Sequence, residues 1–444
     1  MSTDRAGAAN GSLSVSGGGE GRGEVGDSRA LGPTSHSHRF AMGPSLSPLK
    51  GGEGNSARPL NHIVGIPSWY GTARGPGGGY FRDQALALQA AGFRIAMLAP
   101  DIHTLRDLRQ GRVPAARRGG ITVEDDGIPT WRRSGLVLIP RVPYRNALAW
   151  AWGGLKLFAR YRAENGAPDL VHAHCMLNAG VVALAIRRRY GIPYIVTEQS
   201  TSFAQGTLRW WERDLVRRVI AGADKCIAVS PQLARLLEAQ YPGSRWGYLP
   251  NPLGEAFLSD DAAPIARSAA DPFVFVSVAR MSAEKGFARL IEAFAEAFGG
   301  ATEVRLRLAG DGPIRGELER LCAERGVAAQ VDFLGNLSSA EVREAMQAAD
   351  AFVLASDFET FGVVVIEALA CGRPVVVTRS GGPDHLVNPG NGLLIPTRDR
   401  DTLRDALIEM RRRAGDYDPA AIRAEALRCY APDAFARQFA ELVT

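Results

Sequence analysis

One stretch, residues 349–382, constrains the fold more than any other part of the chain. A short apolar run, Ala351–Ala355, has the length of a buried strand and ends in a polar loop. An apolar segment, Gly362–Cys371, comes next, and a β-branched run, Pro374–Thr378, ends at two glycines. The lengths of these runs and the polar residues and glycines that end them predict a strand, a loop, a helix, a second strand and a glycine turn. This succession is one β-α-β unit of a parallel sheet.

The loop after the first predicted strand is the expected binding edge, because ligands of parallel sheets bind outside the carboxyl ends of the strands. It carries Asp357, Glu359, Thr360 and Phe361, and Glu367 lies one to two turns into the helix. Eight helical residues span about 12 Å, whereas a two-carboxylate hydrolase needs about 5–9.5 Å. Glu359 can fold back from its loop, so a hydrolase is disfavoured without being excluded. Two acids that face different parts of one extended ligand fit better.

The string ETFGVVVIEALACGRPVV, with the glycine turn after it, resembles the EX7E signature of the family-4-like retaining glycosyltransferases of the GT-B fold. Further strings described below occur in the family's order, so the resemblance covers about residues 60–444. It implies an α/β fold of two doubly wound Rossmann-like domains that face a cleft, with the donor in the second domain and the acceptor on the first.

The expected domain organisation follows from composition and from this resemblance. Residues 1–58 are rich in Gly, Ser, Ala and Arg and are predicted to be a disordered low-complexity tail. Residues 59–252 would form the acceptor-side domain and residues 253–430 the nucleotide-sugar domain. Residues 431–444 would form a helix that crosses back to the first domain.

Glycines precede the first amphipathic helix of the N-terminal half, in PSWYGTARGPGGGYFRDQALALQAAGF. Glycine lets a backbone approach a phosphate, and a helix N-terminus offers it free N–H groups. The dinucleotide fingerprint GxGxxG fails here because its last position, counted from Gly75, is Tyr80. The string instead resembles the opening of the glycosyltransferase family, which implies a ligand-facing loop with Gly79 as a donor-binding residue.

Two further positions in the N-terminal half are candidate site residues. His174 ends Asp169–His174, which resembles the family's DxVHxH strand and implies a catalytic or acceptor-side histidine at the sheet edge; an isolated histidine is more often structural. Gln199 stands where many relatives have a histidine on the acceptor side. A glutamine can hydrogen-bond to a sugar but cannot carry a proton near neutral pH.

In the C-terminal half, Arg280 and Lys285 flank a strand-to-helix turn in ARMSAEKGF, where phosphates sit in such folds. It is not a Walker loop, because GK[ST] is absent. The string resembles the family's GRLxxEKG, which implies that both cations hold the donor diphosphate. The resemblance also assigns Glu359 to the sugar hydroxyls as a catalytic residue and Glu367 to the ribose. The backbone of Phe361, Gly362 and Val363 would contact the sugar and phosphate.

Charge and cysteine spacing exclude several classes of site. The 444 residues carry a net charge of +5 without any block of like charges, which is too weak a signal for nucleic acid. The five cysteines lie far apart without a CxxC, so neither disulfides nor zinc are expected. The strings Asp399-x-Asp401 and Asp416-x-Asp418 fall in or beside late surface helices. We therefore expect no metal and no cofactor, with a UDP-sugar or GDP-sugar as co-substrate.

Two features bear on localisation. The chain has no run of about 18 uncharged apolar residues and no apolar core of a signal peptide, so a cytoplasmic protein is expected. The segment ALAWAWGGLKLFARYR, residues 147–162, mixes aromatic and basic residues. An ordinary packed helix is the favoured interpretation, and peripheral contact with an anionic membrane at its inner face is the alternative.

The sequence thus predicts a retaining hexosyltransferase. It would move a sugar from a nucleoside-diphosphate sugar to a hydroxyl of a glycan, a lipid-linked acceptor or a small molecule, in cell-surface or exopolysaccharide synthesis. Two alternatives remain: a sugar-nucleotide epimerase on the same fold, and a nucleotide-sugar-binding protein without turnover.

Overall fold

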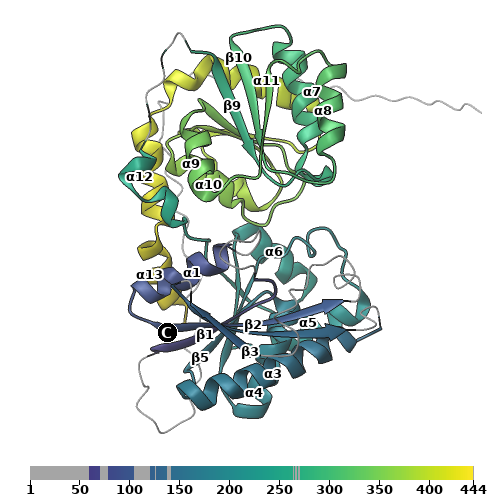
Figure 1. The fold of residues 1–444 in the computed structure, drawn as a ribbon, viewed down its shortest axis with the longest axis vertical. Helices are drawn as coiled ribbons and strands as arrows, with labels where there is room; N and C mark the ends of the chain where they lie inside the picture. The colour runs from purple at the N-terminus through teal and green to yellow at the C-terminus, as the bar shows by residue number, and fades with distance from the viewer. Residues whose placement is uncertain are drawn as a thin grey trace, which may run out of the picture. The chain divides into compact units, whose positions relative to one another are not determined.

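The structure is a computed structural model, and it describes residues 60–70, 79–104, 121–125, 127–137, 142–263, 265, 268 and 271–443. The predicted N-terminal tail lies outside the described residues. Two mainly parallel sheets, each covered by helices, account for the described chain (Figure 1).

The N-terminal half is built on a sheet with the strand order β3-β4-β2-β1-β5-β6-β7-β8. Its strands are β1 His62–Pro67, β2 Arg94–Thr104, β3 Ile121–Asp125, β4 Pro129–Val137, β5 Leu170–His174, β6 Tyr194–Glu198, β7 Lys225–Ala228 and β8 Trp246–Tyr248. Its helices are α1 Gly79–Ala90, α3 Arg145–Asn165, α4 Val181–Tyr190, α5 Trp210–Gly222 and α6 Pro231–Gln240. Only β3 runs antiparallel to its neighbour, at the sheet edge.

Both faces of this sheet are buried, as the continuous apolar strands predict. Alternate residues divide between two hydrophobic clusters: Ile63 belongs to one and Val64 to the other. The cluster of Ile63 includes Phe81 of α1 and Phe439 of the last helix, α13 Pro432–Val443. The ring of Phe439 lies 6.2 Å from that of Phe93 and 5.5 Å from that of His172, so the last helix packs on the N-terminal sheet.

The C-terminal half is built on a parallel sheet with the strand order β11-β10-β9-β12-β13-β14. Its strands are β9 Phe273–Val278, β10 Val304–Ala309, β11 Val331–Gly335, β12 Ala351–Leu354, β13 Val375–Thr378 and β14 Gly392–Ile395. Its helices are α7 Phe287–Phe298, α8 Arg315–Glu324, α9 Ser339–Gln347, α10 Val363–Ala370, α11 Arg400–Arg413 and α12 Pro419–Tyr430. The predicted β-α-β unit of residues 349–382 is β12-α10-β13.

Among the parallel strands of each sheet, the strand order reverses at one point, and such points locate ligand sites in open α/β sheets. In the C-terminal sheet the reversal lies between β9 and β12, which pair in parallel. In the N-terminal sheet it lies between β1 and β5. The segments that follow these four strands are therefore the first places to look for a site.

Candidate active site

Lys285 and Glu359 come from the two segments that follow β9 and β12, at the reversal of the C-terminal sheet. Lys285 ends a short 3-10 helix, Ala283–Lys285, and Glu359 lies in the loop before α10. Gly286 separates Lys285 from α7 with a φ of 71°, and a Cβ at this position would lie 2.1 Å from the carbonyl oxygen of Ala355. Only glycine permits this approach, which places Lys285 directly beside the end of β12.

The two side chains form an ion pair. Lys285 Nζ donates to Glu359 Oε1 at 2.6 Å, and Ser356 Oγ donates to the same oxygen at 2.9 Å. The side chains are 21% and 14% exposed, so solvent reaches both. An anionic ligand at this edge would compete with Glu359 for the ammonium group.

The backbone around Glu359 is held by a strand-like pairing with the glycine turn after β13. Glu359 N donates to Ser380 O at 3.1 Å, and Gly382 N donates to Glu359 O at 2.8 Å. A Cβ on Gly382 would lie 2.1 Å from the carbonyl carbon of Thr360. The glycine turn of the sequence is therefore a close contact that fixes the Glu359 loop.

Helix α10 begins beside this loop. Gly362, with a φ of 90°, precedes its first residue, Val363, and the first N–H groups of a helix are free to bind an anion. The ring of Phe361 is 2% exposed and packs near His385 and Tyr430, at 6.0 and 6.1 Å between ring centres. Phe361 thus anchors the loop through its side chain and leaves only its backbone for a ligand.

Glu367 lies in the second turn of α10 and is half-buried. Burial raises the pKa of its carboxyl to about 8, with a smaller contribution from the charge of Asp83 in α1. Burial likewise raises the pKa of Asp83 to about 6. Glu367 therefore holds a proton near neutral pH in the ligand-free protein.

A pocket of about 630 Å³ opens at the carboxyl ends of β9, β10 and β11. Arg280, Asp311, Asn336 and Val364 are among its lining residues. Because Val364 belongs to α10, this pocket adjoins the N-terminus of that helix. Its volume lies within the range of small-molecule sites. Asp311 and Asn336 were missed from the sequence, although Asn336 directly follows β11 and Asp311 lies two residues after the end of β10.

His174 lies at the end of β5 but is buried, with 2% exposure. Its ring lies 4.1 Å from that of His172 and 4.8 Å from that of Phe81. Burial holds the pKa of His174 well below its usual range. The imidazole is therefore neutral in the ligand-free protein, and its catalytic or acceptor-side role stays a prediction.

Gln199 has an unusual environment. Its side chain is 7% exposed, and neither its Oε1 nor its Nε2 has a hydrogen-bond partner among the described residues. Its backbone carbonyl accepts from Thr360 Oγ1 at 2.9 Å, and its backbone N–H donates to the buried Glu198 at 2.9 Å. The main chain is thus fixed while the amide is left unpaired, and Thr360 links it to the Glu359 loop.

Gly79 is the first residue of α1 and is exposed, with open space where a Cβ would lie. The glycine-rich loop before it, residues 71–78, lies outside the described residues. The donor-binding role of Gly79 stays a prediction.

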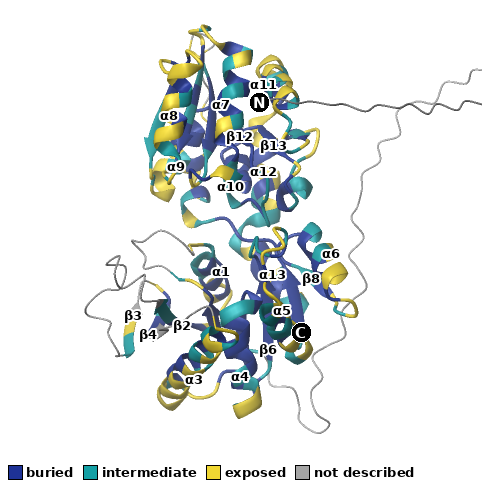
Figure 2. Ribbon diagram, turned by 90° about the vertical axis from the view of Figure 1, so that its right-hand side faces the viewer, coloured by how far each residue is buried: buried dark blue, intermediate teal, exposed yellow. Residues whose placement is uncertain are grey.

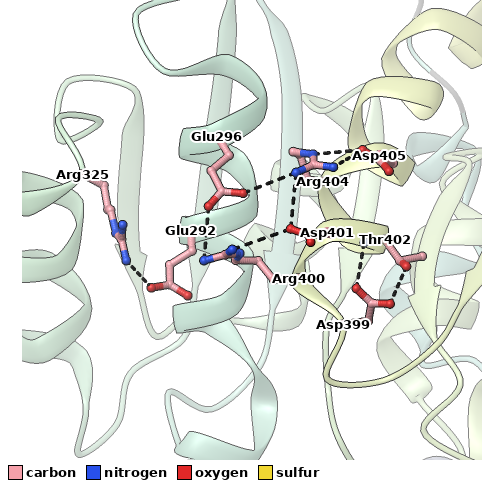
Figure 3. Close-up of polar contacts among 9 residues, drawn as sticks. All are labelled: Glu292, Glu296, Arg325, Asp399, Arg400, Asp401, Thr402, Arg404 and Asp405. Atoms are coloured by element: carbon pink, nitrogen blue, oxygen red, sulfur yellow. Dashed lines mark hydrogen bonds and ion pairs between the residues drawn. The ribbon is translucent and has the colours of Figure 1, made fainter.

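The other acids of the late sequence have structural partners. Asp357 pairs with Arg289 at 2.5 Å and with Arg398 at 3.1 Å. Asp399 caps α11 by accepting from Thr402 N at 2.9 Å, and Asp401 faces arginines of the same helix (Figure 3). Asp418 caps α12. Helix caps and ion pairs therefore account for Asp399, Asp401 and Asp418.

The described part of the chain offers neither a metal centre nor a membrane-spanning helix. No group of three or more His, Cys, Asp or Glu side chains there is arranged to hold a metal ion. None of the helices there is both long and apolar enough to cross a membrane.

Comparison with known proteins identifies relatives of both halves. Residues 77–252 match the family model "Glycosyl transferase 4-like domain", and residues 260–418 match "Glycosyl transferases group 1". The chain is 30% identical over 287 residues to an alpha-D-kanosaminyltransferase of Streptomyces kanamyceticus, covering 58% of this chain and 72% of that protein. It is also 30% identical over 295 residues to a D-inositol 3-phosphate glycosyltransferase of Corynebacterium jeikeium, covering 60% and 70%.

Solved structures share the fold. Sucrose-phosphate synthase from Thermosynechococcus elongatus superposes with a TM-score of 0.68 at 23% identity, covering 86% of this chain and 98% of that one. Anabaena Alr3699/HepE in complex with UDP superposes with a TM-score of 0.63 at 19% identity, with the same coverage. At these identities the likeness establishes the architecture.

Proposed function

Because the chain belongs to the glycosyltransferases that join a 4-like domain to a group 1 domain, we propose that it is a retaining hexosyltransferase that uses a nucleoside-diphosphate sugar. The observation that carries this proposal is the meeting of Lys285, Glu359 and the N-terminus of α10 at one strand reversal. A cation, a carboxylate and free N–H groups are what a diphosphate attached to a sugar requires.

Each group has a role in this proposal. Lys285 and Arg280 neutralise the diphosphate, assisted by the first N–H groups of α10, including that of Val363. The pocket beside Val364 receives the nucleoside, and Glu367 contacts the ribose. Glu359 exchanges its bond with Lys285 for bonds to the sugar hydroxyls. Anabaena HepE, which shares the fold, was crystallised with UDP and with UDP-glucose, which supports a nucleotide-sugar donor.

The reaction needs charge stabilised in two places. The bond from the anomeric carbon to the diphosphate oxygen breaks, and the leaving group gains negative charge, which Lys285 and Arg280 stabilise. The sugar gains the positive charge of an oxocarbenium-like species. Glu359 binds the sugar hydroxyls and places its own negative charge beside the ring. The acceptor oxygen attacks from the same face while its proton passes to the leaving phosphate. The anomeric configuration is retained, and no metal enters the scheme.

Gln199 belongs to the acceptor side of this proposal. Its buried amide offers a donor and an acceptor that no described residue uses, and a sugar hydroxyl would satisfy either. We assign the acceptor to a hydroxyl of a glycan, a lipid-linked acceptor or a small molecule, in cell-surface or exopolysaccharide synthesis inside the cytoplasm. His174 and Gly79 remain candidates on the acceptor and donor sides.

The test begins with a panel of UDP- and GDP-sugars in a thermal unfolding assay. A ligand at about 100 times its Kd stabilises the folded protein by about 2.7 kcal/mol. The stabilising donor is then incubated with the protein, and slow release of nucleoside diphosphate is expected. Binding without release would favour a non-catalytic protein. Conversion of the donor sugar without release would favour an epimerase.

A further inference from the structure

Three neighbouring helices of the N-terminal half, α3, α4 and α5, carry a larger net positive charge than the chain as a whole. They contain ten Lys or Arg residues and three Asp or Glu residues, a net charge of +7. The whole chain carries only +5, so the remainder is slightly negative. These three helices therefore form a net positive surface, which we call the α3–α5 face.

An apolar groove of about 610 Å³ runs between these helices. Each helix contributes a leucine to it, Leu148 from α3, Leu184 from α4 and Leu215 from α5. Its other lining residues include Arg188, Arg189 and Arg218, and none of the described residues that line it is acidic. The groove therefore combines an apolar floor with guanidinium groups.

Large hydrophobic side chains are also exposed on the α3–α5 face. Leu148 is 67% exposed, Trp210 at the start of α5 is 65% exposed, and Trp152 is 54% exposed. Figure 2 shows exposed segments along α3 and α4. Apolar surface rimmed by polar groups marks an interaction site, and a packed helix alone does not account for these exposed side chains.

We propose that the α3–α5 face docks on the surface of an anionic phospholipid bilayer. Leu148, Trp210 and the groove enter the boundary between headgroups and acyl chains, and the arginines contact lipid phosphates. A bilayer presents anionic groups directly above apolar chains, which is the arrangement that the groove complements. The proposal goes beyond the glycosyltransferase function, because docking needs neither donor nor acceptor.

Arg188 and Arg189 are the cations best placed for this contact. Both are exposed at the end of α4. Arg218 forms an ion pair with Asp214 at 2.9 Å, and Arg187 forms one with Asp224. Reversing Arg188 and Arg189 therefore removes lipid-facing charge without breaking either ion pair.

The experiment is flotation of the full chain with vesicles of phosphatidylcholine, with or without phosphatidylglycerol. We expect binding only to the anionic vesicles, and loss of binding in about 1 M salt, where the Debye length is about 3 Å. The double variant Arg188→Glu, Arg189→Glu should bind at least about tenfold less, because each basic residue near an anionic surface strengthens partitioning about fivefold. Leu148→Ser should also weaken binding.

Matched control variants distinguish an effect of the α3–α5 face from an effect of the net charge of the protein. The double variant Arg320→Glu, Arg437→Glu changes charge equally at exposed positions of α8 and α13, and Ile408→Ser alters an exposed apolar residue of α11. Both should bind like the wild type. The proposal is overturned if the wild type ignores anionic vesicles, or if the controls lose binding as the test variants do. It is also overturned if light scattering shows that the face joins two copies instead. Donor hydrolysis by the same variants reports on the glycosyltransferase proposal separately.

Discussion

Lys285 Nζ lies 2.6 Å from Glu359 Oε1, so the two charged groups at the strand reversal neutralise each other in the ligand-free protein. They come from segments 74 residues apart that only the parallel pairing of β9 with β12 brings together. A diphosphate that binds the ammonium group of Lys285 would release Glu359 from the ion pair, so that Glu359 could bind the sugar. The same ion pair therefore couples occupation of the two proposed subsites.

The stability of the ligand-free protein should depend on the ionisation of Glu367. Burial raises the pKa of this carboxyl from 4.5 to about 8, so between these values the folded state binds more protons than the unfolded state. The contribution of the Glu367 carboxyl to the free energy of unfolding is fully present below about pH 4.5. It falls as the pH rises and no longer changes above about pH 8.

Glu367→Gln should remove this dependence. We expect urea unfolding to show the wild type losing stability between about pH 5 and pH 8, on the order of 1 kcal/mol or more from this group, with a flatter profile for the variant. Asp83 titrates in the same direction in both proteins, so the difference between them reports on Glu367 together with its interaction with Asp83. Identical pH profiles would contradict the assigned pKa.

Gln199→Leu should separate stability from activity. The amide is buried without a hydrogen-bond partner among the described residues, and an unpaired buried polar group costs about 1–3 kcal/mol. The variant should be as stable as the wild type or more stable, yet turn over acceptor more slowly, as steady-state kinetics would measure.

Gln330→Leu is the matched control for that prediction. The Nε2 of Gln330 donates to Phe298 O at 2.9 Å and to Ala301 O at 2.8 Å, so its loss should destabilise the protein and leave kcat unchanged. If Gln199→Leu behaved in the same way, Gln199 would be structural.

Substitutions of the two glutamates of the EX7E string should have different kinetic effects. Glu359→Gln removes a charge beside the sugar, where positive charge develops only as the bond breaks, so kcat and kcat/KM should fall together. Glu367→Gln replaces a protonated carboxyl with an amide of the same shape. We expect modestly weaker donor binding with kcat largely kept. Calorimetry and steady-state rates compare the two variants, and equal losses of affinity and kcat would refute the division of roles.

Activity should survive EDTA. Lys285, Arg280 and the N-terminus of α10 supply the positive potential that the leaving diphosphate needs in this proposal. The measurement is product formation after exhaustive chelation, with added manganese as the comparison. Complete loss that manganese restores would show that an ion shares this task.

The sequence predicted the central β-α-β unit, because its apolar runs are continuous and end at Gly, Pro or polar residues. Strands β3 and β4 were missed, since PTWRRSGLV alternates with arginines and pairs at a sheet edge. Strand β14, Gly392–Ile395, is four residues long and was also missed.

The candidate site was less predictable than the fold. Glu359 and Lys285 were found from their strings, but their ion pair depends on the strand order, which no local pattern reveals. The burial of His174 was not foreseen, because a histidine at a strand end looks the same in sequence whether Phe81 covers it or not. The unpaired amide of Gln199 likewise results from contacts with Glu198 and Thr360.

The most direct test of the account is the rate of nucleoside diphosphate release from the stabilising donor, for the wild type and for Lys285→Ala. Loss of one charge-assisted contact at a developing charge costs about 3 kcal/mol, so we expect the variant to be at least about a hundredfold slower. Lys156→Ala, at an exposed lysine of α3, should release nucleotide at the wild-type rate. A folded Lys285→Ala protein that kept the wild-type rate would contradict the proposed diphosphate site.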